Sequence, residues 1–541
     1  SSLNCYDTIT KTINIVPAIN SYPYFENFNN STGGWYTISN TVNESSWIYD
    51  FPNGAFEGQN DNPNPAKIWK TAAYPDSLPS GYLEDENSFL VGPSFDLSDL
   101  EKPMVAFDMW LDVEDERYEG AILEYSINGE DWFAFGSVND QLNWYNITNN
   151  SPIGGQNTNE DAVAWYFQGN ERNWIRVAHV INEELISDLS NVSFRINFNG
   201  GLFSNAPDGM AIDNFYVGER QKLVLLENFT NLNSEDYNTK RKQVEILKDS
   251  EIGKDILNLN FHISSPTPDY INNRNSVELD SRATNYSIQE SSRLIIDGGK
   301  FDNSIINTAD NSLTEEFKST ITRQSLLEPS DLINIMIDED ADTNIVRFNV
   351  LHRPNELNTE DIVVYFFIIE KSFENNDSIN NIVRKVLPNI NGLKLKDFEE
   401  GSSINYEWEV NTIYTNEDLA VATVIQNQIS NEVLEVMLTD INSFKIPKEI
   451  VNSIKENFTI GMKIYPNPSR GLVNIAFSES LEEDIDLMVF DIKGALIKHK
   501  SVKAGSQTEE FNLTGISSGV YHIILKDNDG NLSRKKLVIL D

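Results

Sequence analysis

The sequence predicts a mostly β, multidomain protein that contains one α/β segment. Its 541 residues correspond to about three or four domains of roughly 150 residues each. Short runs of alternating apolar and polar residues, bounded by turn residues, recur along most of the chain. Hydrophobic and aromatic contents of 40% and 11% are high enough for several buried cores and too high for a disordered acidic chain.

Charge and hydropathy exclude several classes of partner. The chain has 41 basic and 83 acidic side chains and a net charge of −42, so it lacks the basic surface that nucleic acids or anionic membranes require. The longest apolar run, Ile362–Ile369, has the length of a strand and predicts no transmembrane segment. The polar sequence after Ser1 predicts that no signal peptide remains. A single cysteine, Cys5, allows no internal disulfide.

Residues 21–219 are predicted to form a β-sandwich. Eight of the nine tryptophans lie in this region, and Asn128-Gly129 is a strong hairpin signal between two strand-like runs. Large aromatic side chains are typical of such a core. Trp144 and Trp165, which are flanked by asparagine-rich loops, are expected to be the exposed exceptions and the best candidates for stacking on a sugar.

The middle of the chain is predicted to hold an α/β unit followed by a second β-sandwich. Val224–Phe229 and Ile256–Ile263 are buried-type strands on either side of a helical segment near Ser234–Lys254. Asp361–Ile369 is a further strong strand, and a helix is expected near Asn376–Leu387. We expect this sandwich to pack on the α/β unit.

The last segment has strand candidates spaced by about 8–12 residues, as in a small β-sandwich. The changes in pattern along the chain define the predicted domains. These are an N-terminal tail at 1–20, a β-sandwich at 21–219, an α/β domain at 220–325, a β-sandwich at 326–446, a linker at 447–460 and a small β-sandwich at 461–541.

A set of short motifs in the last segment has a family-specific order and spacing. It includes Tyr465, Pro466, Asn467, Pro468, Gly519, Tyr521, Lys535 and Lys536. In these residues the segment resembles the type A C-terminal sorting domain of the Bacteroidetes type 9 secretion system. The resemblance implies export after cleavage of a signal peptide, handling by the secretion machinery, and an extracellular or cell-surface location associated with the outer membrane.

A second set of motifs spans Leu223–Ile446. It includes Val224–Thr230, His262, Pro266, Asp269, Arg282, Tyr286 and Ile295–Gly298. Here the chain resembles a Bacteroidetes outer-membrane protein family with a thioredoxin-like unit and a β-sandwich. The redox motif of that family is degenerate, because its two cysteines fall on Ser234 and Tyr237 and its active-site proline on Ser292. Dithiol chemistry needs a stabilised thiolate and a resolving thiol, so the resemblance implies a thioredoxin-like unit without redox activity.

The N-terminal segment carries a third set of motifs. It includes Phe25–Phe28, Gly34-Trp35, Phe89–Pro93, Glu124–Gly129 and Ala211–Phe215. In these the segment resembles the MAM-like jelly-roll group, which includes choice-of-anchor J and cleaved-adhesin domains. The resemblance implies a binding or adhesion module with a structural calcium ion held by Glu26 and Asp213, and Asp208 is a candidate additional ligand. The alternative is that these are ordinary surface carboxylates.

Together these observations predict a non-enzymatic cell-surface or secreted binding protein. It would act in adhesion, in capture of a glycan or protein, or as a subunit of an outer-membrane complex. The five histidines share no metal-ligand spacing, although a Ser-His-Asp triad assembled from distant positions stays open. The alternatives are a secreted hydrolase that acts on a glycan or peptide through the jelly-roll domain, and a purely structural subunit.

Overall fold

The computed structural model divides the chain into two compact units, Ser1–Glu219 and Arg220–Asp541. Cys5 and the predicted linker at 447–460 lie outside the described residues. The structure describes residues 18–540 except 40–44, 53–55, 57–66, 73–80, 116–118, 150–161, 169–172, 202–207, 301–303, 308–312, 330–332, 340–342, 351–358, 374–375, 398–402, 410–417, 441–461, 478–479, 482–483, 492–495 and 527–531.

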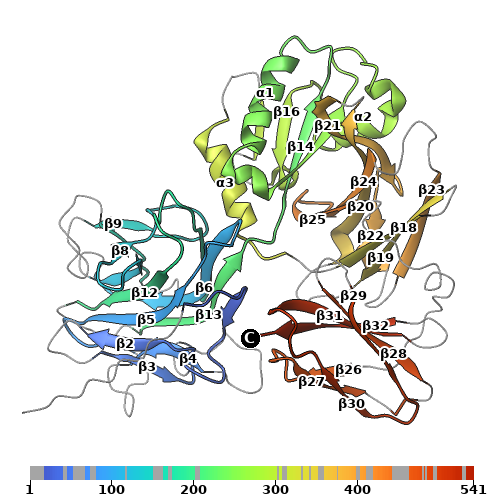
Figure 1. The fold of residues 1–541 in the computed structure, drawn as a ribbon. Coiled ribbons are helices and arrows are strands. Elements are labelled where there is room, and N and C mark those ends of the chain that lie inside the picture. The colour runs from blue at the N-terminus through green and yellow to red at the C-terminus, as the bar shows by residue number, and fades with distance from the viewer. Residues whose placement is uncertain are drawn as a thin grey trace, which may run out of the picture. The chain divides into compact units, whose positions relative to one another are not determined.

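The N-terminal unit contains two large antiparallel sheets (Figure 1). The first has the order β11 (Ile175–Val180), β6 (Pro103–Asp112), β13 (Gly209–Glu219), β4 (Ile68–Thr71), β3 (Trp47–Asp50), and β1 (Tyr24–Glu26) also pairs with β13. The second has the order β2 (Tyr36–Ser39), β5 (Asn87–Phe95), β12 (Val192–Asn199), β7 (Gly120–Ser126), β8 (Phe133–Ala134). A short pair, β9 (Ile147–Asn149) with β10 (Ala162–Ala164), completes the strands.

An aromatic-rich core joins the two sheets of this unit. Phe107 of β6 stacks on Phe215 of β13, with ring centroids 5.6 Å apart. The expectation that Trp144 and Trp165 are exposed is wrong, because they are 3% and 0% exposed and lie edge to face at 4.9 Å. The loops fold inward at these positions because each indole N–H donates to a backbone carbonyl, that of Phe135 and that of Asn143.

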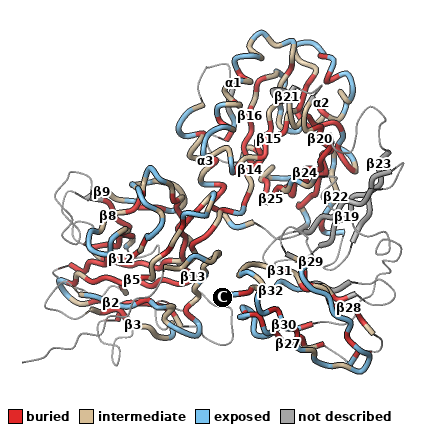
Figure 2. The backbone as a smooth tube through the Cα atoms, in the orientation of Figure 1, coloured by how far each residue is buried: buried red, intermediate tan, exposed pale blue. Residues whose placement is uncertain are grey.

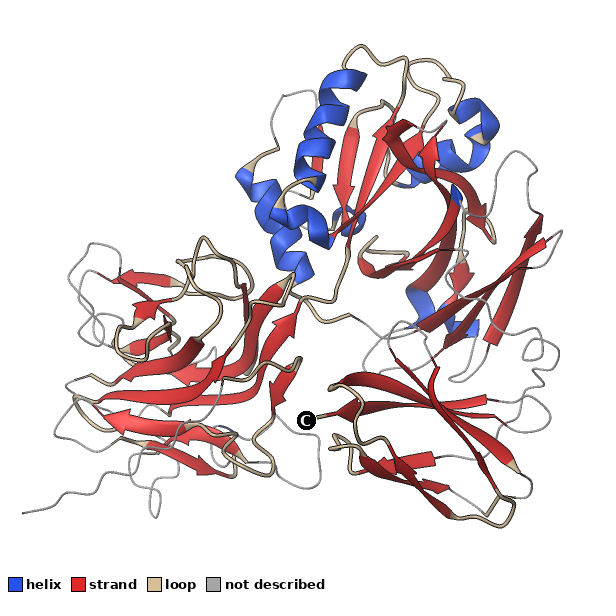
Figure 3. Cartoon of the chain, in the orientation of Figure 1, coloured by secondary structure: helices blue, strands red, loops and turns tan. Residues whose placement is uncertain are grey.

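The second unit contains a nine-stranded sheet with helices on both faces (Figures 1 and 3). The sheet has the order β17 (Ile305–Asn307), β16 (Arg293–Ile296), β14 (Val224–Thr230), β15 (Ile256–His262), β21 (Asn376–Leu387), β20 (Ile362–Phe373), β24 (Leu419–Asn427), β25 (Val433–Asp440), and β22 (Leu393–Lys394) also pairs with β20. The helices are α1 (Tyr237–Lys248), α2 (Ser276–Asn285) and α3 (Glu315–Ser325). A separate sheet has the order β18 (Ile333–Glu339), β19 (Thr343–Val350), β23 (Ser403–Glu409).

The helix expected near 376–387 is wrong, because this segment is the strand β21. It lies inside the sheet, parallel to β15 and antiparallel to β20. Ile382, Val383 and Val386 are all buried, since a central strand is covered on both faces and its apolar residues need not alternate. β21 therefore continues the sheet that β14 and β15 begin, so the sheet runs across the predicted boundary at 325/326.

The two faces of the nine-stranded sheet pack against different helices. α1 and α3 contribute Val244, Leu247 and Phe317 to one cluster, together with Val224 and Leu226 of β14. α2 contributes to a cluster on alternate strand positions that include the aliphatic and aromatic residues of β15. Figure 2 shows the buried positions concentrated along these central strands.

The C-terminal segment forms two further sheets around its own apolar cluster. One has the order β26 (Met462–Tyr465), β27 (Leu472–Phe477), β30 (Thr508–Asn512), and the other has the order β29 (Leu496–Val502), β28 (Ile485–Asp491), β31 (Gly519–Lys526), β32 (Leu532–Ile539). The protein is thus mostly β and multidomain, with a C-terminal β domain. Across the residues that are described, no helix combines the length and the apolar character needed to cross a membrane.

Candidate functional site

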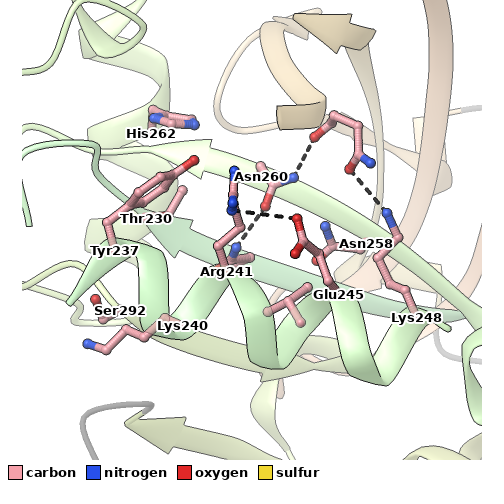
Figure 4. Close-up of a pocket in the computed structure, with 13 residues that line it drawn as sticks. Thr230, Tyr237, Lys240, Arg241, Glu245, Lys248, Asn258, Asn260, His262 and Ser292 are labelled. Atoms are coloured by element: carbon pink, nitrogen blue, oxygen red, sulfur yellow. Dashed lines mark hydrogen bonds and ion pairs between the residues drawn. The ribbon is translucent and has the colours of Figure 1, made fainter. Parts of the chain in front are cut away.

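A small cavity lined mostly by residues of polar types lies between α1 and the strands β14, β15 and β21 (Figure 4). Its volume is about 40 Å³. This is enough for about three ordered waters or one small polar group, at 10–15 Å³ for each. The cavity is therefore too small for a sugar ring but large enough for a compact ligand or the end of a side chain.

Helical and strand periodicity direct the polar side chains into this cavity. Tyr237, Arg241 and Lys248 lie on one face of α1, because residues four apart are neighbours on a helix. On β15, Asn258, Asn260 and His262 face the cavity, while the alternate residues Leu259 and Phe261 join the apolar cluster on the opposite face of the sheet. In Figure 4 Tyr237, Arg241 and Lys248 project from α1 toward the strands.

Three asparagines form a chain of hydrogen bonds across the floor of the cavity. Asn228 Nδ2 donates to Asn260 Oδ1 at 2.7 Å. Asn260 Nδ2 in turn donates to the backbone carbonyl of Asn380 at 2.5 Å. Lys248 Nζ donates to the side-chain oxygen of Asn380 at 3.2 Å. These bonds hold the three parallel strands and the end of α1 in one polar layer.

A buried His-Asp pair closes one end of the cavity. His262 Nδ1 lies 2.8 Å from Asp269 Oδ2, and both side chains are 1% exposed. Burial would raise the pKa of Asp269, but the hydrogen bond and charge of His262 and the amides of Asn272 and Leu232 hold it below its usual value. No described residue bonds to His262 Nε2, which leaves this nitrogen available to the cavity.

Basic side chains line the cavity beside carboxylates. Lys240, Arg241 and Lys248 line it, and Lys240 is paired with Asp236 and Arg241 with Glu245. Burial lowers the pKa of Lys248, and the nearby carboxylates of Asp249 and Glu245 oppose that shift. Carboxylates therefore compensate most of the positive charge at this cavity.

The degenerate redox positions lie beside this cavity. Ser234 Oγ and Ser292 Oγ both donate to Asp236 Oδ1, at 2.6 and 3.2 Å. Asp236 also pairs with Lys240. Burial would raise the pKa of Asp236, but the bonds from Lys240, Ser234 and Ser292 lower it. Tyr237 begins α1, so the position of the second thiol carries a phenol that lines the cavity.

Sequence reasoning placed Ser234, Tyr237 and Ser292 in this region but missed the residues that make the cavity polar. The available signal was the alternation of Asn258, Asn260 and His262 in an otherwise apolar strand. Such an alternation places all three side chains on one face. That face would be apolar if it only packed against a helix.

The structure brings two of the three predicted calcium ligands to one region of the N-terminal unit. β1 pairs with β13 so that Glu26 lies opposite Phe215, and Asp213 lies opposite Asp108 of β6. Asp213 is 2% exposed. Burial, together with the charges of Asp108 and Glu26, raises the pKa of Asp213 to about 7. Asp208 directly precedes β13, and its backbone carbonyl accepts a hydrogen bond from the amide of Gly81 at 2.6 Å.

Glu26 and Asp213 offer carboxylate oxygens, the ligands that calcium prefers. Burial raises the pKa of Glu26 as well, and the hydrogen bond from the amide of Phe28 opposes that shift. Gly33 has φ +61°, and a Cβ added there would lie 2.5 Å from Glu26 Cγ, so glycine leaves the space that this side chain occupies. Within the described ranges, no three His, Cys, Asp or Glu side chains already form a metal cage. The two carboxylates suit a hard cation whose coordination shell is completed by oxygens from other groups.

The predicted sorting motif joins the two ends of the C-terminal domain. Asn467 Nδ2 donates to the carbonyl of Lys536 at 2.9 Å, and the amide of Val538 donates to Asn467 Oδ1 at 2.8 Å. Pro466 and Pro468 flank Asn467 in the bend after β26. Tyr521 Oη donates to the carbonyl of Ser517 at 2.7 Å. Tyr465 is the last residue of β26. The remaining motif residues lie on β31 and β32, where Gly519 has φ +156° and Lys535 is exposed, like Lys536.

Comparison with solved structures gives only distant likenesses. The K1 cleaved-adhesin domain of Lys-gingipain from Porphyromonas gingivalis W83 is 11% identical, with a TM-score of 0.22, covering 37% of this chain and 99% of that one. A domain of the outer-membrane lipoprotein Omp28 from Porphyromonas gingivalis is 17% identical, with a TM-score of 0.17, covering 21% and 91%. The C-terminal family 22 carbohydrate-binding module of a Clostridium thermocellum protein is 10% identical, with a TM-score of 0.20, covering 38% and 97%.

Comparison of sequences identifies the C-terminal domain. No curated protein matches the chain. Residues 463–540 match the family described as "Secretion system C-terminal sorting domain", which confirms the predicted sorting domain. The chain is therefore a cargo of the type 9 secretion system, which delivers it to the cell surface or the extracellular space.

Proposed function

We propose that this exported protein is a non-enzymatic binding protein built from a MAM-like sandwich and a thioredoxin-like unit without redox activity. The observation that carries the proposal is the network at Asp236. Dithiol exchange needs two thiols, but the two cysteine positions carry Ser234 and Tyr237. Ser234, and Ser292 at the proline position, donate hydrogen bonds to the carboxylate of Asp236. The single cysteine of the chain, Cys5, is distant in sequence and cannot supply a pair.

The topology of the second unit supports the thioredoxin-like assignment. Its elements follow the order β14, α1, β15, α2, β16, β17, α3. β14 is parallel to β15 and antiparallel to β16, and β16 is antiparallel to β17. The degenerate redox positions fall at the end of β14 and the start of α1, where thioredoxin-like proteins carry their motif.

The surroundings of His179 argue against a histidine-dependent hydrolase in the N-terminal unit. His179 is the one histidine between residues 21 and 219. Its side chain is fully buried, with Nδ1 2.7 Å from the carbonyl of Val180 and Nε2 3.0 Å from Asp140 Oδ2. Because both ring nitrogens are occupied, neither can take a proton from a nucleophile.

Two measurements on the full chain test the proposal. The first is affinity purification from native outer membranes, where we expect a stoichiometric surface protein or glycan partner. The second is an activity panel of glycans, peptides and a dithiol substrate, where we expect no turnover. Turnover of any panel member would refute the non-enzymatic assignment, and activity lost on deletion of residues 21–219 would identify the hydrolase alternative.

We also propose that calcium stabilises the N-terminal unit through Glu26 and Asp213. The support is the buried carboxyl group of Asp213 with the half-buried carboxyl group of Glu26 near it. Arg176, the cation that acts on Asp213, bonds to Asp108 at 3.2 Å. A thermal melt followed by tryptophan fluorescence reports this unit, since it holds eight of the nine tryptophans. We expect a chelator to lower the midpoint and calcium to restore it. An unchanged midpoint would contradict the calcium site.

A further inference from the structure

The second unit buries a lysine directly against an aspartate. Lys222 Nζ donates to Asp297 Oδ2 at 2.7 Å, and the two side chains are 3% and 0% exposed. Lys222 lies just before β14, and Asp297 directly follows β16. Because both charges have left water, transfer of a proton from the ammonium to the carboxylate is less unfavourable here than at the surface. The pair can therefore reach the neutral form, an amine beside a carboxylic acid.

The two oxygens of the Asp297 carboxyl group have different surroundings. Oδ1 accepts a hydrogen bond from the backbone amide of Leu225 at 2.8 Å, whereas Oδ2 accepts from Lys222 Nζ. When a nucleophile attacks a carboxyl carbon, negative charge develops on one oxygen, and a fixed backbone N–H stabilises it. The amide of Leu225 is placed to stabilise this charge on Oδ1, while Oδ2 lies beside the amine and can leave as water.

The backbone holds this carboxyl group in place. Asp297 has φ +41°, which is unusual for a residue other than glycine. The next residue, Gly298, has φ +82°, and a Cβ added there would overlap the carbonyl oxygen of Asn431. A residue keeps such a conformation only where the surrounding structure enforces it, and such residues cluster at reactive sites. The turn therefore fixes the carboxyl group of Asp297 against Lys222 before any reaction.

A second carboxylate that acts on Asp297 is already paired with another cation. Glu227 accepts hydrogen bonds from Arg282 Nε at 2.8 Å and from Arg282 Nη2 at 3.1 Å. Burial and the charge of Glu227 raise the pKa of Asp297, against the opposing effects of Lys222 and a backbone hydrogen bond. A raised pKa favours the protonated carboxyl group, which is the form that loses water.

We propose that Lys222 and Asp297 condense to an intramolecular amide, which links the start of β14 covalently to the end of β16. The ammonium first gives a proton to Oδ2, and the freed amine attacks Cγ and forms the N–C bond. Oδ2 then leaves as water with two of the three protons of the original ammonium, so no other reactant is consumed. The inference goes beyond the proposed binding function and does not depend on it.

Two other ion pairs of this unit show why burial and a lysine are both needed. Arg220 and Asp255 are buried to a similar extent, at 4% and 3% exposure, but a guanidinium stays protonated and is no nucleophile. Lys240 and Asp236 are 11% and 39% exposed, so water solvates their charges and keeps them ionised. The pair of Lys222 and Asp297 combines an amine with a buried carboxyl group.

Mass spectrometry of the full chain, purified in the folded state and then denatured, tests the proposal directly. We expect the intact mass to lie below the mass of the sequence by one water molecule. Trypsin should release a branched peptide that joins 221–240 to 294–300, because it does not cleave after a lysine whose amine is in an amide. A chain of full mass that yields 223–240 and 294–300 as separate peptides would overturn the proposal.

Variants separate the cross-link from dehydration of the Asp297-Gly298 peptide. Lys222→Arg keeps a positive charge beside Asp297 but removes the nucleophile, so we expect the full mass. Lys240→Arg, in the exposed pair, is the matched control and should keep the loss of one water. A succinimide between Asp297 and Gly298 also loses one water, but it leaves 294–300 unlinked and persists in Lys222→Arg, and either result would overturn the proposal. If Lys222→Arg does not fold, the tryptic digest of the native chain still decides.

Discussion

The two faces of β14 show how differently one strand can bury polar groups. Toward α2, Glu227 is completely buried and accepts hydrogen bonds from Arg282 at 2.8 and 3.1 Å and from Tyr286 at 2.6 Å. Gln426 Oε1 accepts another from Arg282 at 2.9 Å. Toward α1, Asn228 begins a polar layer in which hydrogen-bonding groups are left open.

This difference separates a structural polar network from a candidate binding site. The network around Glu227 is closed, because the charge is paired and its oxygens are occupied, which is what a buried ion pair needs in order to be tolerated. The layer beneath α1 is open, because Oδ1 of the buried Asn258 has no hydrogen-bond partner among the described residues. Both faces are polar in sequence, so only the pattern of partners distinguishes them.

The largest expected effect comes from breaking the closed network. Arg282→Ala leaves the carboxylate of Glu227 buried without its counter-ion, so we expect a loss of about 3–5 kcal/mol in the free energy of unfolding. Arg241→Ala is the matched control on the opposite face. Its ion pair with Glu245 is long and partly exposed, so its loss should cost less than about 1 kcal/mol. Urea denaturation of the two variants measures both values, and equal losses would remove the distinction between the faces.

The acidic site of the N-terminal unit provides a test by pH. The folded pKa of Asp213, about 7, lies above its unfolded value of about 3.9. The folded state therefore holds more protons in this interval. The stabilisation is complete below about pH 4 and is lost as the pH rises toward 7, by up to about 4 kcal/mol.

We expect this fall in stability when tryptophan fluorescence follows urea unfolding of the full chain in the presence of a chelator. Saturating calcium should remove it, because the cation stabilises the ionised carboxylates. The variant Asp213→Asn cannot titrate at this position and should show neither the pH dependence nor its suppression. Identical pH profiles with chelator and with calcium would contradict the calcium site but would not contradict the raised pKa of Asp213.

Sequence reasoning succeeded where one physical signal dominated. The strands around Val224 and Ile256 and the helix between them follow from local periodicity and turn residues, whereas the sorting domain follows from the resemblance of its motifs to a known family. It failed at β21, because Ile382, Val383 and Val386 are buried on both faces and imitate a helical stripe. It also failed at Trp144 and Trp165, because the polar residues beside them in the sequence do not reveal that each indole N–H donates to a buried backbone carbonyl.

The cavity beneath α1 was not predicted from the sequence. The resemblance gave Ser234, Tyr237 and Ser292 only as degenerate redox positions, with no ligand expected there. The Asn258 amide and the cations of α1 became a site only through the register of β15 and β21, which pairing between distant segments determines. Local patterns contain no information about which groups find partners across a sheet.

A pair of leucine substitutions sharpens the contrast within the open layer. Asn260→Leu removes the side chain that bonds to both Asn228 and Asn380, leaving those partners unpaired, and should cost about 2 kcal/mol. Asn258→Leu removes an amide oxygen that has no described partner and should leave stability unchanged or raise it by up to about 1 kcal/mol. Urea denaturation without added anions measures both. A loss in Asn258→Leu as large as that in Asn260→Leu would mean that Asn258 is a structural residue.

The smallest expected effect concerns an asparagine whose hydrogen bonds are complete but exposed. Asn467 bridges the start of the sorting domain to β32 through two bonds, yet water can replace both when the side chain is lost. Asn467→Ala should therefore cost only about 1 kcal/mol, seen as roughly fivefold faster hydrogen exchange at Val538. Asn512→Ala, which removes a turn contact to Thr514, should leave exchange in β32 unchanged. Asn258, Asn260 and Asn467 are the same residue type. Differences in stability among their variants therefore report how deeply each side chain is buried and whether it has hydrogen-bond partners. Exchange in β32 that is insensitive to Asn467→Ala would show that strand pairing alone joins the two ends of the domain.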